Sequence, residues 1–308
     1  MSDVPAGRAP RLMWVRAGLT FAILLAPHNA VGQGTARRDG PPWLVVLGSA
    51  QDGGIPQAGS PDHPAWVNTD LRRRVVSLGL VEPATGQRWI FEATPDFREQ
   101  LHLLDEIAPV DASPGLAGIF LTHAHIGHYT GLIFLGHESL GAREVPVFAM
   151  PGMRHFLSNN GPWSQLVGYG NIVLRALEAG TPVPLGDRLS IEGPNRTVLF
   201  IPDIDSWEEW DAWGVSIEDE IASVDVAYLD ATFFADGELP GRDMSGFPHP
   251  LIAHSMERFA ALPDAERAKI RFIHLNHSNP AADPDTVVRA EIEAGGFRVA
   301  AEGERVTL

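Results

Sequence analysis

Short apolar runs alternate with amphipathic stretches along the chain from residue 43 to its end. Runs rich in Val, Leu, Ile and Phe and bounded by Gly or Pro are typical of buried strands, whereas apolar residues three and four apart indicate helices with one buried face. This alternation predicts an α/β fold. The predicted strands cover residues 43–50, 73–82, 88–93, 118–122, 145–150, 198–201, 224–229 and 270–275. The predicted helices cover residues 95–107, 129–140, 152–167, 210–222, 250–262 and 285–294.

The first residues have the pattern of an export signal. Arginines within residues 1–16 precede an apolar run at 17–26, and small and polar residues at 27–33 end that run. The apolar run is too short to span a bilayer unaided, and the order of basic, apolar and small residues is that of a secretory signal peptide. We therefore expect residues 1–42 to be a signal peptide and linker, and the mature protein to be periplasmic or secreted. An uncleaved anchor is the alternative.

Composition limits the function classes. The chain has 308 residues, of which 44% are hydrophobic and 20% charged, which is enough for one large domain over residues 43–308. The formal net charge of −16 and the pI near 5.1 argue against nucleic acid and against an anionic membrane surface as partners, because both attract basic patches. The sequence contains no cysteine, so any metal must be held by histidine and carboxylate.

Closely spaced histidines follow the predicted strand at 118–122. His123 and His125 lie two positions apart, so they point to the same side of an extended segment, and a turn at Gly127 can return His128 to them. Neutral imidazole is the commonest protein ligand for zinc and also binds iron. A site with three protein ligands leaves a position open for water or substrate. The spacing therefore predicts a catalytic metal site at these histidines.

The segment 122–128, Thr-His-Ala-His-Ile-Gly-His, resembles the HxHxDH signature of the metallo-β-lactamase superfamily, with Gly127 in the place of the aspartate. This resemblance implies an αββα sandwich, in which helices flank two mixed sheets and the site lies at their common edge. Further segments are similar, in the same order, to the coenzyme PQQ synthesis protein B family. They are residues 48–57, 92–96, 122–132, 199–205, 228–233, 241–244 and 273–280.

The first of these segments, residues 48–57, is a glycine-rich loop. It lacks the Gly-Lys-Ser/Thr ending of a phosphate-binding loop, so nucleotide binding is not expected. Paired glycines either form a tight turn or allow the backbone to approach a ligand closely, and the sequence leaves both interpretations open.

The resemblance also implies the remaining site residues. Asp203 matches the carboxylate that bridges the metal or metals opposite the histidines. One of His274 and His277 matches the histidine that closes the site from a later strand end. Asp230 and His249 resemble a relay in which a carboxylate supports a histidine that protonates the leaving group, which makes His249 a candidate general acid.

Two departures from the superfamily pattern concern the metal site. Gly127 removes the aspartate that serves a second metal, so one ion is expected in preference to two. The third motif of the superfamily carries a histidine ligand before Asp203, but this interval offers only His137 and His155, both in predicted helices. The connection at 186–193 is unusually short, as though a segment carrying that ligand were missing.

Three functions are compatible with these residues. The first is a metal-dependent hydrolase, in which activated water attacks a carbonyl or phosphoryl group of a small-molecule substrate. Zinc is the expected ion, with iron or manganese as alternatives. The second, implied by the resemblance to the PQQ family, is an iron-dependent oxygenase. The third is a non-catalytic ligand-binding or carrier protein with a degenerate metal site.

Overall fold

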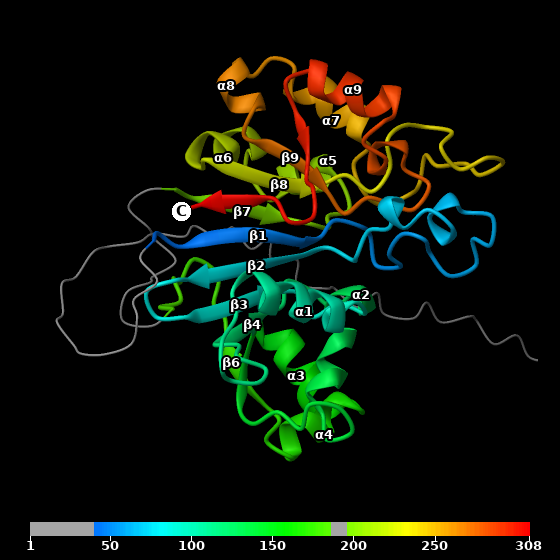
Figure 1. Cartoon of the computed structure of the whole chain (residues 1–308). Helices are drawn as coiled ribbons and strands as arrows, with labels where there is room; N and C mark the ends of the chain where they lie inside the picture. Colours follow the sequence, from blue (N-terminus) through cyan, green and yellow to red (C-terminus); the bar gives the residue numbers. More distant parts are fainter. Residues whose placement is uncertain (1–39, 186–195) are drawn as a thin grey trace, which may run out of the picture.

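The computed structural model of the chain describes residues 40–185 and 196–308. Two β-sheets pack face to face, and helices cover the outer face of each sheet (Figure 1). The first sheet has seven strands in the order β11-β1-β2-β3-β4-β5-β6, and the second has four in the order β10-β9-β8-β7. The strands are β1 (Trp43–Gly48), β2 (Ser77–Glu82), β3 (Gln87–Phe91), β4 (Gly118–Phe120), β5 (Val145–Ala149), β6 (Ile172–Ala176), β7 (Val198–Ile201), β8 (Val226–Asp230), β9 (Ile270–Ile273), β10 (Arg298–Val299) and β11 (Arg305–Thr307). The α-helices are α1 (Phe97–Ile107), α2 (Ile126–Tyr129), α3 (Pro151–Asn159), α4 (Trp163–Gly168), α5 (Trp207–Ala212), α6 (Ile217–Ser223), α7 (Ile252–Phe259), α8 (Asp264–Arg267) and α9 (Val287–Ala294).

Apolar side chains fill three layers of this sandwich. The central layer joins the two sheets, with Leu80 and Phe120 from the first packing together with Phe200 and Tyr228 from the second. A second layer lies between the first sheet and α1, α3 and α4. A third layer lies between the second sheet and α5, α6, α7 and α9. The predicted αββα arrangement is therefore confirmed.

The central strands appear in the sequence as continuous apolar runs because both faces of each strand are buried. In β1, Leu44 and Val46 face the central layer, whereas Val45 and Leu47 face the helices. A strand covered on both sides gains free energy from apolar residues at every position rather than at alternate ones. This is why the pattern of the sequence located the central strands.

The carboxyl ends of β1, β3 and β4 and of the strands of the second sheet lie at the same edge of the sandwich. β1 and β3 both run antiparallel to β2, and β4 is parallel to β3. In the second sheet β7, β8 and β9 are parallel. Backbone hydrogen bonds join the two sheets at this edge: the Gln51 N–H donates to the Leu275 carbonyl over 2.8 Å, and the Leu275 N–H donates to the Ser49 carbonyl over 2.9 Å.

Several predicted helices are shorter in the structure because turn-forming residues interrupt them. The helix predicted at 152–167 is α3 followed by α4, with Pro162, which has no N–H to donate, before α4. The helix predicted at 210–222 is α5 and α6, separated at Gly214, whose φ of 78° lies in the left-handed region. The stretch predicted as a helix at 129–140 is the end of α2 followed by a 3₁₀ helix. The strands β6, β10 and β11 and the helix α8 were not predicted.

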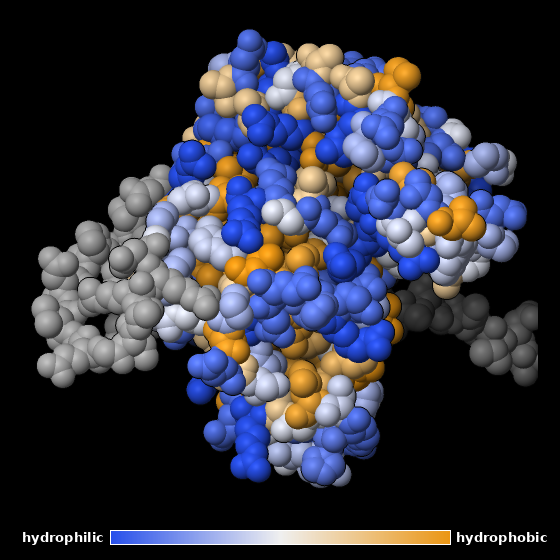
Figure 2. Space-filling view, in the orientation of Figure 1, coloured by the Kyte–Doolittle hydropathy of each residue, from blue (hydrophilic) through white to orange (hydrophobic). Residues whose placement is uncertain are grey.

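Within the described residues, no helix combines the length and apolar character needed to cross a bilayer. Hydrophilic residues cover most of the face drawn in Figure 2, with hydrophobic residues between them in small groups. The predicted signal peptide falls outside the described residues, as does the short connection predicted at 186–193. Export therefore stays a prediction from the sequence.

Candidate metal centre

Loops at the carboxyl ends of strands from both sheets supply the candidate site. Asp52 follows β1, the histidine run follows β4, and Asp203 follows β7. Asp230 is the last residue of β8, and His274 comes directly after β9. Because these strands end at the same edge of the sandwich, side chains that are far apart in the sequence meet there, where ligands of such folds commonly bind.

His123, His125 and Asp203 form a first group of possible metal ligands, called group 1 here. Oδ2 of Asp203 lies 2.9 Å from Nε2 of His123 and 2.6 Å from Nδ1 of His125. The two rings meet at a steep angle, with centroids 4.5 Å apart. The side chain of His125 is 57% exposed, so group 1 is open to solvent and to a substrate.

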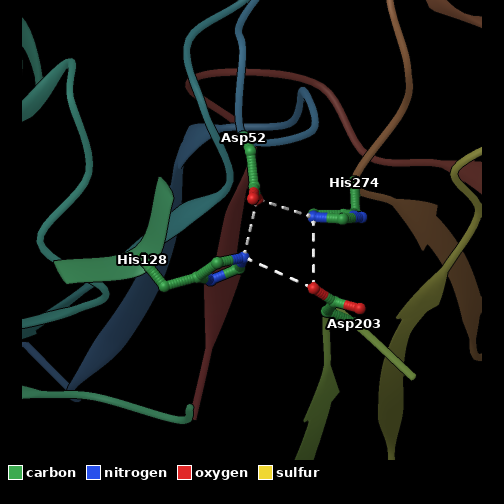
Figure 3. Close-up of side chains that lie close together, drawn as sticks. All are labelled: Asp52, His128, Asp203 and His274. Carbon is green, nitrogen blue, oxygen red and sulfur yellow. Dashed lines mark hydrogen bonds and ion pairs between the residues drawn. The ribbon is translucent and has the colours of Figure 1, made fainter. Parts of the chain in front are cut away.

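Asp52, His128, Asp203 and His274 form a second group, called group 2 (Figure 3). Oδ1 of Asp52 lies 3.0 Å from Nε2 of His128 and 3.4 Å from Nε2 of His274. Oδ2 of Asp203 lies 3.8 Å and 3.9 Å from the same two nitrogens. Both imidazoles are completely buried. Two ring nitrogens and two carboxylate oxygens therefore surround one point, and its two imidazoles are more deeply buried than those of group 1.

Polar side chains behind the rings fix their orientation. Thr232 donates its hydroxyl proton to Oδ1 of Asp230 over 2.8 Å, and the same hydroxyl oxygen lies 2.9 Å from Nδ1 of His274. Nδ1 of His274 must therefore be the donor, which leaves Nε2 unprotonated in the neutral ring, facing Asp52 and Asp203. Support of this kind for the outer nitrogen is typical of histidines that bind metals.

Several residues at the candidate site have an unusual backbone conformation. The non-glycine residues with left-handed φ in the described chain include Glu92, His249 and His274, with φ of 71°, 84° and 70°. Glu92 is fully buried, with Oε2 3.5 Å from Nδ1 of His128. Such conformations cost free energy and persist where the surrounding structure holds a functional side chain in place.

The donor set of group 2 fits a metal ion. Neither ring nitrogen of His128 makes a well-aligned hydrogen bond within the described residues, although both are buried. A buried polar atom without a well-aligned hydrogen bond costs free energy, and a cation bound between the two rings would satisfy both Nε2 and the nearby Oδ1 of Asp52. Nitrogen and carboxylate oxygen together suit zinc, iron and manganese.

Charge distribution in group 2 matches this assignment. Burial opposes protonation of His128, but the carboxylates of Asp52 and Glu92 outweigh it and raise its pKa to about 9. Burial likewise opposes protonation of His274, whereas Asp230 and Asp52 raise its pKa to about 10. Burial favours the protonated form of Asp52, yet the neighbouring imidazoles hold its pKa well below the ordinary range. Without metal, protons therefore take the place of the cation at neutral pH.

Asp230, His249 and His274 form a third group of possible metal ligands, which shares His274 with group 2. Nδ1 of His249 lies 2.8 Å from Oδ2 of Asp230 and 3.4 Å from Oδ1 of Asp203. Oδ2 of Asp230 also accepts a hydrogen bond from the Ile204 N–H over 3.0 Å. Burial opposes protonation of His249, but Asp230 outweighs it and raises its pKa. His249 is therefore oriented through Nδ1, and its protonated form is more stable than that of a free imidazole.

The remaining histidines that the sequence offered lie elsewhere. Within the described residues, His277 belongs to none of these three groups: its carbonyl oxygen lies 3.0 Å from Nε2 of His63, and its ring packs edge-on against the His63 ring. Of the two alternatives left open by the sequence, the structure thus brings His274 to the site. His137 and His155 are exposed, and neither belongs to a group.

Asp52 is the site residue that sequence reasoning missed. It lies in the glycine-rich loop 48–57, which was interpreted only as a turn or as a backbone contact with a ligand. A carboxylate in the loop that follows a buried strand was the available signal, because such loops meet at one edge of an α/β fold. Asp52 is far from the histidine run in the sequence, so no local pattern showed that the two lie close together.

Comparisons with known proteins agree with this architecture. Coenzyme PQQ synthesis protein B of Methylorubrum extorquens (strain PA1) is 26% identical over 305 residues, which cover 86% of this chain and 99% of that protein. The crystal structure of Zn(2+)-bound PqqB from Methylobacterium extorquens has a TM-score of 0.71 at 22% identity, over 86% of this chain and 100% of that one. A diphosphatase from the PhnP family has a TM-score of 0.53 at 17% identity, over 86% of this chain and 96% of that one.

A family model described as "Beta-lactamase superfamily domain" matches residues 87–275, which is more than half of the chain. The matched region contains the histidine run, Asp203, Asp230, His249 and His274, and it leaves out Asp52. On this match, together with the two-sheet sandwich and the ligands at its edge, the chain belongs to the beta-lactamase superfamily.

Proposed function

We propose that this protein is a metal-dependent hydrolase acting on a carbonyl or phosphoryl group of a small molecule. The observation that carries the proposal is the convergence of four imidazoles on one buried carboxylate, Asp203, with the polarised His249 beside it. When bound, a cation at such a site lowers the pKa of water toward neutrality and polarises a substrate oxygen. Zinc is favoured because a similar protein was solved with Zn(2+), and iron or manganese suits the same donors.

The side chains of the site have different expected roles. His123 and His125 with Asp203, and His128 and His274 with the same carboxylate, would hold metal. His249 has Nδ1 engaged by Asp230, so Nε2 is the atom that can give a proton to a leaving-group oxygen. Asp230 orients His249 and favours its protonated form. The exposed side of His125 gives substrate access to this arrangement.

The similarity to coenzyme PQQ synthesis protein B over most of the chain favours a second candidate, an iron-dependent oxygenase. Anaerobically iron-loaded protein would then consume oxygen when a tyrosine-derived precursor is added. Hydrolysis without oxygen consumption would reject this candidate. Tight binding of a small anionic or quinone ligand without turnover would instead support a carrier.

Metal content and turnover test the proposal together. Protein purified after expression in zinc-supplemented medium should carry at least about one equivalent of metal, measured by inductively coupled plasma mass spectrometry. The double variant His123→Ala/His125→Ala should lose the metal of group 1 and lose hydrolysis of phosphodiester, lactone and thioester substrates. His155→Ala, which replaces an exposed histidine of α3, is the matched control and should change neither. Wild-type protein free of metal would contradict the proposal.

Zinc affinity should increase with pH. Metal-free His128 and His274 are protonated at neutral pH because their pKa values are raised to about 9 and about 10, and zinc binds only the neutral rings. Each proton released adds about a factor of ten in affinity per pH unit below those values. Competition with a calibrated chelator between about pH 6 and pH 8 should therefore show a rise of roughly ten- to hundredfold per unit. An affinity independent of pH would show that the rings are already neutral.

A further inference from the structure

Gly127 and Asp52 compete for the same space. A Cβ atom at position 127 would lie 2.6 Å from Cβ and from Cγ of Asp52, and 2.7 Å from its Cα. Real Cβ atoms essentially never approach other heavy atoms so closely, and the nearby atoms belong to the root of a short side chain rather than to a flexible end. While Asp52 is in place, position 127 can therefore hold only glycine.

The carboxylate of Asp52 occupies the region into which a side chain at 127 would project. Its Oδ1 contacts Nε2 of His128, which is the next residue after Gly127, and it also contacts Nε2 of His274. Figure 3 shows Asp52 descending from the loop after β1 onto these two rings, opposite Asp203. The carboxylate absent from the histidine run is thus present in space, and it comes from another strand.

The loop that carries Asp52 is fixed to the second sheet. The Gln51 N–H donates to the Leu275 carbonyl over 2.8 Å, and the Asn276 side-chain amide donates to Oε1 of Gln51 over 2.6 Å. Ala50 forms a bridge with Leu275. Contacts of the two residues before Asp52 with the end of β9 therefore hold Asp52 next to His274, as a metal ligand requires.

We propose that Asp52 replaces the missing aspartate of the histidine motif, and that the protein consequently binds two metal ions. Group 2 then has four protein ligands, namely Asp52, His128, His274 and Asp203. Group 1 has His123, His125 and the same Asp203, which leaves it more open to water and substrate. This proposal rests on the proposed metal-dependent function and replaces the expectation of a single ion, which was based on Gly127 alone.

Asp203 is placed to be shared by the two ions. Its Oδ2 lies 2.9 Å and 2.6 Å from ring nitrogens of His123 and His125 in group 1. The same atom lies 3.8 Å and 3.9 Å from ring nitrogens of His128 and His274 in group 2. The rings of His123 and His128, one from each group, have centroids 4.2 Å apart. Paired metal sites with ions about 3.5–4 Å apart commonly use one bridging oxygen to hold the attacking and leaving groups of a displacement.

Removal of the Asp52 side chain tests the proposal through metal stoichiometry. Wild-type protein equilibrated with zinc chloride and passed through metal-free buffer should retain two zinc ions per chain. Asp52→Gly should retain one, because group 2 loses a ligand while group 1 stays intact. Asp62→Gly, in the exposed part of the same loop region, is the matched control and should retain two.

The outcomes separate this proposal from the proposed function. Wild-type protein that retains one zinc, with Asp52→Gly unchanged, overturns the role of Asp52 but leaves a metal-dependent hydrolase intact. Wild-type protein with no zinc defeats the proposed function itself. Thermal melts in the presence of chelator establish that each variant is folded. A folded Asp52→Gly protein that still retains two ions also overturns the proposal, because it shows that Asp52 is not needed to hold the second ion.

Discussion

Asparagine at position 203 should leave the purified protein without bound metal. Asp203 is the carboxylate common to groups 1 and 2, and its side chain is only 4% exposed, so water cannot easily replace it as a ligand. Burial favours its protonated form, yet the neighbouring imidazoles of His123 and His125 hold its pKa far below the ordinary range. The carboxylate is therefore anionic at any working pH, and the amide removes a full charge from the centre of the site.

Hydrolysis by Asp203→Asn should fall by roughly 10³-fold or more, because activation of water and polarisation of substrate both depend on the bound cation. Metal content is measured by mass spectrometry and turnover on the substrate that wild-type protein hydrolyses. Asp225→Asn is the matched control: Asp225 is exposed at the opposite end of the second sheet, where its carboxylate accepts the Thr197 N–H. A folded Asp203→Asn protein with normal metal content would mean that the two groups do not share this residue.

Alanine at position 249 should lower kcat by about 10²-fold while leaving metal content and KM close to wild type. His249 contacts Asp230 and Asp203 and belongs to neither of the two proposed metal groups. Its expected task is to protonate the leaving group, so the loss should grow with the pKa of the leaving group. Nitrophenyl esters release nitrophenolate, a leaving group that needs no proton. The variant should hydrolyse them nearly as fast as wild-type protein does.

His254→Ala provides the control for this second prediction. His254 lies on α7, its side chain is 62% exposed, and its Nε2 lies 3.7 Å from a carboxylate oxygen of the exposed Asp236, so its loss should not change the rate for any leaving group. Asp230→Asn should reproduce the leaving-group dependence of His249→Ala, because it removes the group that orients the ring and favours its protonated form. If His249→Ala loses metal and slows all substrates equally, His249 is a ligand rather than a proton donor.

The central strands could be predicted because burial on both faces gives them unbroken apolar runs, as in Val198–Ile201. Short edge strands lack that signal: β10 has two residues, one of them exposed. Helices α3 and α4 share an amphipathic pattern that continues across their break, so periodicity alone joined them. The boundaries of these elements were therefore decided by turns and packing rather than by the apolar pattern.

The sequence by itself determined which candidate ligands lie on one segment. The spacing of His123, His125 and His128 follows from the twofold repeat of extended backbone and a local turn, and both are local properties. Asp203, Asp230 and His249 followed from resemblance, and the structure places all of them at the same edge. Sequence reasoning could not choose between His274 and His277, because the choice depends on where the chain leaves β9.

Only the tertiary structure decided that Asp52 belongs to the site and that His277 pairs with His63 instead. Asp52 and His274 are far apart in the sequence, and they meet because backbone hydrogen bonds fasten the loop after β1 to the end of β9. Spacing within one segment says which side chains share a face of that segment. The position of a carboxylate on another strand depends on how the two sheets pack, which no local pattern contains.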